Sequence, residues 1–169
     1  MILQTARTHL QLAQASDFNE LLAMYAEPDT FKYIKPLQNR SRQEYFSFLQ
    51  SRIDLSKKEE GYYWVARLQD SNELVGAMNL TPFRDTGIMQ IGFQLRRKFW
   101  QQGFGTELAE AVLQHAVTSV GLTEVYGFYE SENIASHRIL QKLGFRFKER
   151  RQFDADDVPL EVVVFEGKK

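Results

Sequence analysis

Residues 88–117 read IMQIGFQLRRKFWQQGFGTELAEAVLQHAV, and this stretch decides the fold. Its first part carries apolar residues at Ile91, Phe93 and Leu95, a partial alternation that is typical of a mostly buried strand. From Leu108 onward, apolar residues recur every three to four positions, which predicts an amphipathic helix. The stretch therefore predicts a strand, a turn and a helix in succession.

The predicted turn carries two glycines, Gly103 and Gly105. Because glycine has no side chain, the backbone there can turn tightly. A helix that begins at such a turn presents unpaired N–H groups and the positive end of its dipole, and both favour a phosphate. The alternative is that the glycines only permit the turn, since short glycine motifs often occur without a ligand.

Two common phosphate-binding loops do not match these residues. A dinucleotide-binding fingerprint needs a third glycine three residues after the second, where this chain has Leu108. A P-loop needs Gly-Lys-Ser or Gly-Lys-Thr, and neither tripeptide occurs in the sequence. The turn therefore belongs to neither class.

Residues 90–108, QIGFQLRRKFWQQGFGTEL, resemble the acyl-CoA-binding motif of the GNAT N-acetyltransferases. Trp100 is similar to the tryptophan of the branch that contains the ribosomal-protein N-terminal acetyltransferases. A second block, ENIASHRILQKLGF at 132–145, follows at the distance that this family shows. The resemblance extends over nearly all of the chain. It implies an α/β fold with a mixed central sheet of six to seven strands, splayed at two central parallel strands and flanked by about four helices.

The patterns along the chain agree with that order of elements. Three helices are predicted besides the central one. Each begins at a capping residue that precedes an amphipathic segment: Ser16, Ser41 and Asn133. The two parallel strands that splay apart are expected at 88–95 and 125–129. The other strands are expected at 8–14, 62–68, 74–81, 147–153 and 160–165.

Composition bounds the other possibilities. With 169 residues and 43% hydrophobic content, the chain fits a single domain spanning 1–169. A net charge of −1 gives no reason to expect nucleic acid or an acidic membrane surface as a partner. No apolar run long enough for a membrane span and no secretory pattern is seen, so we expect a cytoplasmic protein. The absence of cysteine excludes disulfides, thiolate metal sites and a cysteine acyl-enzyme, and with three histidines we expect no metal.

The resemblance implies acetyl-CoA as co-substrate and assigns residues to bind it. Phe93 and Leu95 would meet the pantetheine arm, and Asn133 would hydrogen-bond it. The alternative is that Asn133 is an ordinary helix cap, and one side chain cannot easily do both. The basic run 96–98 could contact the 3′-phosphate or could be a solvated surface run. The pyrophosphate would be held by the backbone N–H groups of Gln102, Gly103, Phe104, Gly105 and Thr106.

The reaction implied is acetyl transfer to a primary amine by direct attack within a ternary complex. By the same resemblance, Ser136 would stabilise or protonate the leaving thiolate. The tyrosine acid of many family members is replaced by Leu140, and a common glutamate is replaced by Gln90, which cannot act as a base. The sequence therefore does not identify the general base. Glu130, which we take as a candidate catalytic residue, and Glu132 are the remaining nearby carboxylates, and a chain of water molecules would serve equally well.

Several alternatives stay open at this point. The acceptor could be a protein N-terminus or a small amine, and the protein could be a monomer or a homodimer. The missing glutamate and tyrosine also allow a non-catalytic acyl-CoA-binding module. A weaker possibility is a nucleotide-binding protein that uses the glycine turn for another phosphate ligand.

Overall fold

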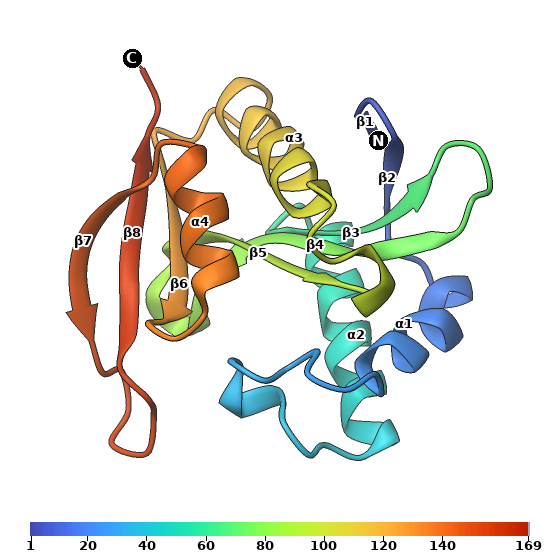
Figure 1. The fold of residues 1–169 in the computed structure, drawn as a ribbon, viewed down its shortest axis with the longest axis horizontal. Helices are drawn as coiled ribbons and strands as arrows, with labels where there is room; N and C mark the ends of the chain where they lie inside the picture. The colour runs from blue at the N-terminus through green and yellow to red at the C-terminus, as the bar shows by residue number, and fades with distance from the viewer. Residues whose placement is uncertain (169) are drawn as a thin grey trace.

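Eight strands form one sheet in the computed structural model, which describes residues 1–168 (Figure 1). The spatial order is β1-β2-β3-β4-β5-β6-β8-β7, and every neighbouring pair is antiparallel except β5 and β6. The strands are β1 (Ile2–Gln4), β2 (Thr8–Leu12), β3 (Tyr62–Leu68), β4 (Leu74–Pro82), β5 (Met89–Leu95), β6 (Glu124–Glu130), β7 (Arg146–Arg151) and β8 (Leu160–Glu166).

The expected count of six to seven strands was too low by the short edge strand β1. This strand has three residues and pairs with β2 through Leu3 and Leu10. Three residues are too few to show an alternating pattern, so the pairing partner, and not the local sequence, makes this segment a strand. The other seven strands lie where the sequence predicts them, within a few residues at their ends.

Four α-helices cover the two faces of the sheet, as predicted (Figure 1). They are α1 (Phe18–Tyr25), α2 (Arg42–Lys57), α3 (Phe104–Thr118) and α4 (Ile134–Lys142). One buried cluster joins the sheet to α3 and α4, and a second joins it to α1 and α2. Successive side chains of β3 point to opposite faces of the sheet and so enter different clusters. Trp64 belongs to the first cluster, while Tyr63 and Val65 belong to the second. No helix within residues 1–168 is long and apolar enough to cross a membrane.

The predicted helix caps were right at Ser41 and wrong at Ser16. The Ser41 hydroxyl accepts a hydrogen bond from Glu44 N at 3.1 Å, and Glu44 Oε2 accepts one from Ser41 N at 2.6 Å, which completes a capping box. Ser16 instead lies inside a 3₁₀ turn, Ala15–Asp17, that precedes α1. There the Asp17 carboxylate accepts from Gln14 N at 2.8 Å, so the acid supplies the cap contact.

The splay between the two parallel strands is confirmed. Only Gln90 and Tyr126 pair between β5 and β6, whereas all of β5 pairs with β4 and all of β6 pairs with β8. Beyond the Gln90–Tyr126 pair, the facing edges of the two strands lack a ladder partner. Unpaired backbone groups in a sheet interior need another partner, and this gap positions the candidate site.

Candidate active site

A cavity of about 610 Å³ opens where β5 and β6 separate. Its walls come from both layers of the molecule, with Phe93 on β5, Glu130 on β6, Ser136 on α4 and Arg52 on α2. The loop between α1 and α2 contributes Thr30 and residues 33–37 to the lining. The cavity therefore connects the gap in the sheet with the face that α1 and α2 cover. Its volume is within the range of small-molecule sites.

The N-terminal turn of α4 places two of the predicted residues in this cavity. Asn133 caps the helix, since its Oδ1 accepts a hydrogen bond from Ser136 N at 3.2 Å. The capping alternative for Asn133 is thus realised, and it uses only the amide oxygen. Its NH₂ group and the Ser136 hydroxyl make no hydrogen bond to another residue within 1–168. Both groups remain available to a ligand.

Glu130 ends β6 and is half-buried at the cavity wall. Burial raises the pKa of this carboxyl, the neighbouring Glu132 charge raises it further, and Lys35 lowers it in part. A carboxylate with a raised pKa is a better proton acceptor than an ordinary glutamate, so the environment suits a general base. Among residues 1–168, no group of three His, Cys, Asp or Glu side chains is placed to hold a metal ion.

The glycine turn lies at the N-terminus of α3, outside the cavity but on the same face as α4. Gln101 and Gly103 both have left-handed backbone conformations, with φ of 59° and 82°. Within residues 1–168, the backbone N–H groups from Gln101 to Thr106 donate no hydrogen bond of good geometry, although residues 100–103 form a turn. A run of unpaired N–H groups at a helix N-terminus is the arrangement that binds phosphate oxygens. The predicted loop thus fits a pyrophosphate.

The two glycines of this turn are required for different reasons. Gly103 precedes α3 with a positive φ, which L residues rarely adopt. Gly105 is buried inside the first turn, where an added Cβ would lie 2.6 Å from Cδ1 of Ile139 on α4. The second glycine therefore sets how closely α3 approaches α4. Leu95, predicted to meet the pantetheine, lies beside this contact and does not line the cavity.

Arg7, which lies just before β2, contacts the glycine turn and the first turn of α3. Its Nε donates to Glu107 Oε2 at 2.7 Å, its Nη1 donates to the Gln102 carbonyl at 3.0 Å, and its guanidinium stacks on Phe104 at 3.8 Å. The Arg7 side chain is 42% exposed, so its charge also reaches the solvent beside the unpaired N–H groups. No sequence pattern predicts this contact, because Arg7 lies 100 positions from Glu107 and 95 from Gln102.

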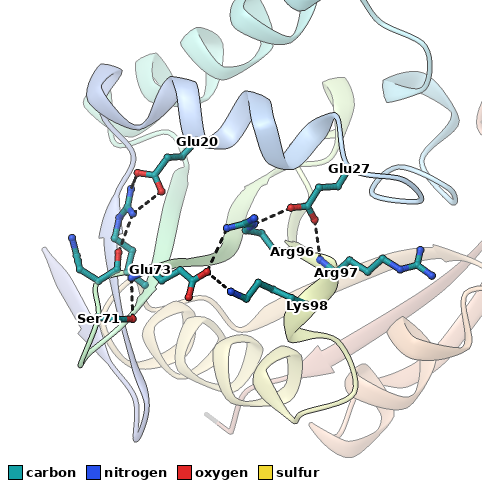
Figure 2. Close-up of polar contacts among 9 residues, drawn as sticks. Glu20, Glu27, Ser71, Glu73, Arg96, Arg97 and Lys98 are labelled. Atoms are coloured by element: carbon teal, nitrogen blue, oxygen red, sulfur yellow. Dashed lines mark hydrogen bonds and ion pairs between the residues drawn. The ribbon is translucent and has the colours of Figure 1, made fainter.

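The basic run 96–98 is largely paired with carboxylates (Figure 2). Arg96 Nε contacts Glu27 at 2.8 Å, and Lys98 Nζ contacts Glu73 at 2.5 Å. Arg97 donates its backbone N–H to Glu27 at 3.0 Å and pairs through its side chain with Asp29. These contacts tie the end of α1 and the β3–β4 turn to the segment after β5. The run is therefore neither a simple solvated surface nor a set of unpaired charges.

Two residues of the cavity wall were missed by the sequence reasoning. Tyr129 lines it, and its hydroxyl is hydrogen-bonded to His137 Nδ1 at 2.8 Å. Burial and the nearby Glu161 charge raise the pKa of Tyr129, so the phenol stays protonated at neutral pH. Arg52 lines the opposite side. The only available signal was a charged residue next to the apolar face of the second helix.

A family model described as an acetyltransferase (GNAT) domain matches residues 7–146. The chain belongs to the GNAT acetyltransferase family. Among its relatives is YoaA of Bacillus subtilis, described as an uncharacterized N-acetyltransferase, with 24% identity over 146 residues that cover 86% of this chain and 82% of YoaA. The p20 protein of Bacillus licheniformis is described in the same way. It is 25% identical over 147 residues, which cover 85% of this chain and 82% of p20.

Solved structures share the GNAT fold over almost the whole chain. RimL, a ribosomal L7/L12 α-N-protein acetyltransferase in complex with coenzyme A, has a TM-score of 0.84 at 16% identity, with 98% of each chain covered. A GNAT-family acetyltransferase from Bacillus anthracis has a TM-score of 0.83 at 18% identity, again over 98% of both chains. At such identities the likeness shows the fold, and this GNAT protein is an N-acetyltransferase by its family.

Proposed function

We propose that this protein transfers the acetyl group of acetyl-CoA to a primary amine by direct attack within a ternary complex. One observation supports this more than any other. The parallel strands part beyond the Gln90–Tyr126 pair, and the gap opens into a cavity reached from both faces of the sheet. A thioester lying in the gap from the α3–α4 side would meet an amine entering from the α1–α2 side. RimL, which shares this fold, is described in complex with coenzyme A.

Three elements would bind acetyl-CoA. The unpaired N–H groups between Gln101 and Thr106 would hold the pyrophosphate, and the free edge of β5 around Phe93 would hydrogen-bond the pantetheine amides. The Asn133 NH₂ group would donate to a pantetheine carbonyl while its oxygen continues to cap α4. The two roles that seemed exclusive for Asn133 use different atoms of one amide.

Two residues would carry the chemistry. Glu130, with its raised pKa, would take a proton from the ammonium or the attacking amine, directly or through water. The amine nitrogen then bonds to the thioester carbon, the carbon–sulfur bond breaks, and the electron pair leaves with sulfur. Nitrogen loses two protons in all, one to Glu130 and the other to the thiolate or to solvent. The Ser136 hydroxyl would donate a hydrogen bond to that thiolate, whose ordinary pKa is about 8.5. No acyl-enzyme is needed, and the chain has no cysteine to form one.

The test measures binding and turnover separately. Calorimetric titration with acetyl-CoA, ATP and NAD shows which phosphate ligand binds, and we expect only acetyl-CoA to bind tightly. Release of free thiol from acetyl-CoA is then followed with a panel of N-terminal peptides, amino acids and simple amines. Binding of acetyl-CoA without turnover on any amine would favour the non-catalytic acyl-CoA-binding module. Tight binding of ATP or NAD in place of acetyl-CoA would contradict both.

A further inference from the structure

Of the three basic side chains that line the cavity within residues 1–168, Lys35, Arg52 and Arg84, only Arg52 has no polar partner. Arg84 pairs with Asp154 at 2.5 Å and with Asp157 at 2.6 Å. Lys35 donates to the Asp156 carbonyl and is close enough to Glu130 to lower its pKa. Arg52 makes no ion pair and no side-chain hydrogen bond within residues 1–168, although it lines the same cavity.

Arg52 is held in this position by the face of α2 that it shares with two apolar residues. Phe48, Arg52 and Leu55 follow one another at helical spacing, and all three line the cavity. The guanidinium carbon lies 4.8 Å from the centre of the Phe48 ring. Such stacking fixes the plane of the guanidinium but supplies no negative charge.

The groups behind Arg52 cannot neutralise it. Its buried neighbours are the phenols of Tyr25 and Tyr63, which are hydrogen-bonded to each other. Burial raises the pKa of Tyr63 to about 12 and raises that of Tyr25 well above its ordinary value, so both phenols are neutral at neutral pH. Burial also lowers the pKa of Arg52, which shows that its charge is poorly solvated.

Another arginine in the same layer shows what a matched charge looks like here. Arg67 is 8% exposed, and its guanidinium contacts Asp17 at 2.9 Å and Glu20 at 3.0 Å. A poorly solvated charge is normally paired in this way, because an unpaired one is costly. Arg52 lacks such a partner among residues 1–168, and the side of the cavity it faces is the one that an acceptor would enter.

We propose that the acceptor is a small primary amine that carries a carboxylate, and that Arg52 binds this carboxylate. The guanidinium offers paired donors that match the two oxygens of a carboxylate, and Phe48 keeps them in one plane. The cavity of about 610 Å³ must also admit the pantetheine arm, which leaves room for a small acceptor only. This inference rests on the proposed acetyl transfer, because it assigns the acceptor of that same site.

The first experiment uses matched acceptors with the whole wild-type protein. Glycine, L-alanine, L-methionine, L-phenylalanine, L-glutamate and γ-aminobutyrate are each compared with the corresponding amide, with acetyl-CoA saturating and thiol release as the readout. The α-amides have less basic amines, so a larger fraction is unprotonated and, without carboxylate recognition, they would react faster. We expect instead that at least one free acid is preferred over its amide by about ten-fold or more in kcat/KM.

The second experiment changes the arginine. In Arg52→Gln we expect KM for the preferred acid to rise about 10- to 100-fold, kcat/KM for its amide to change less than about three-fold, and the acid–amide preference to vanish. Arg52→Lys should restore part of the preference, since it keeps the charge without the paired donors. Arg42→Gln removes an exposed arginine of the same helix, outside the cavity, and should leave all these values unchanged.

Stability and cofactor binding separate the possible failures. Because Arg52 is unpaired, Arg52→Gln should leave Tm and the affinity for acetyl-CoA unchanged or slightly raised. If acetyl-CoA binds and amines are acetylated, but amides are used as well as acids or peptides are the only acceptors, the inference about Arg52 is wrong while the proposed function stands. Acetyl-CoA binding with no acetylation anywhere in the panel also overturns it. Failure to bind acetyl-CoA contradicts the proposed function itself.

Discussion

Glu130 is the residue whose protonation should control the rate. Burial is the largest of the effects that raise the pKa of its carboxyl. A general base works only when it is deprotonated, so activity should fall as the pH drops through that raised pKa. The acidic limb of the kcat profile is therefore expected above the ordinary glutamate range of about 4.3. In Glu130→Gln we expect kcat to fall about 10²-fold or more and this limb to vanish. An unchanged limb would mean that another group is the base.

The neighbours of Glu130 provide matched controls that move the same limb in opposite directions. Glu132 raises the pKa of Glu130, so Glu132→Gln should shift the limb to lower pH and keep the plateau rate. Lys35 lowers that pKa, so Lys35→Met should shift the limb to higher pH.

The same raised pKa predicts how Glu130 affects the free energy of unfolding. A carboxyl whose pKa is raised on folding favours the fold only when protonated, so Glu130→Gln should not destabilise the protein at neutral pH.

Individual residues also show how far the sequence could go. Ser136 and Asn133 could be placed from the second block of family-like sequence, and the structure brings both to one cavity. Arg52 could not be placed, because its significance is the absence of a partner, which no sequence pattern displays. The pairing of Arg96 with Glu27 was equally hidden, since the two residues are 69 positions apart and meet only through the fold.

At the scale of elements, the contact between α3 and α4 is set by Gly105. In Gly105→Ala the new Cβ would lie 2.6 Å from Ile139 Cδ1, the far end of a side chain that can rotate away, so relieving this contact should cost about 1 kcal/mol of unfolding free energy. This cost offsets the gain of roughly 0.5–1 kcal/mol that alanine brings inside a helix, so we expect a small net change in the free energy of unfolding. Urea unfolding measures the difference, and acetyl-CoA affinity should fall, because α4 carries Asn133.

A double variant separates that contact from a simple helix effect. Ile139→Val removes the Cδ1 methyl, so Gly105→Ala/Ile139→Val should be more stable than the sum of the two single changes predicts. Gly103→Ala is the matched control, because its cost would come from a φ of 82° and would not be rescued by Ile139→Val. Additive behaviour of Gly105→Ala and Ile139→Val would refute the proposed contact.

The elements themselves were largely predictable from local pattern. The β3–β4 hairpin and the central helix follow directly from alternation and helical spacing. The caps were less certain, since Ser41 and Ser16 look alike in sequence and only Ser41 has Glu44 three residues later to close a capping box. The strand β1 was missed because its three residues are ordered by pairing with β2. The splay was expected from the family resemblance alone, because periodicity says nothing about where two strands part.

At the scale of the whole molecule, the sheet consists of two parts joined across β5 and β6 by one residue pair, Gln90 with Tyr126. A ligand lying in that gap would contact both parts. We expect acetyl-CoA at 100 times its Kd to stabilise the protein by about 2.7 kcal/mol, since it would bind only the folded state. For a chain of this size, that corresponds to a rise in Tm of roughly 5–10 °C.

Amide hydrogen exchange then locates where that stabilisation acts. Among the described residues, the N–H groups of 101–106 have no acceptor at good hydrogen-bond geometry, so acetyl-CoA should slow their exchange together with that of the facing edges of β5 and β6. Pantetheine alone, which lacks the phosphates, is the control and should protect the strand edges but not the glycine turn. A rise in Tm without protection at 101–106 would place the pyrophosphate elsewhere. In that case the unpaired N–H groups of this turn would have another function.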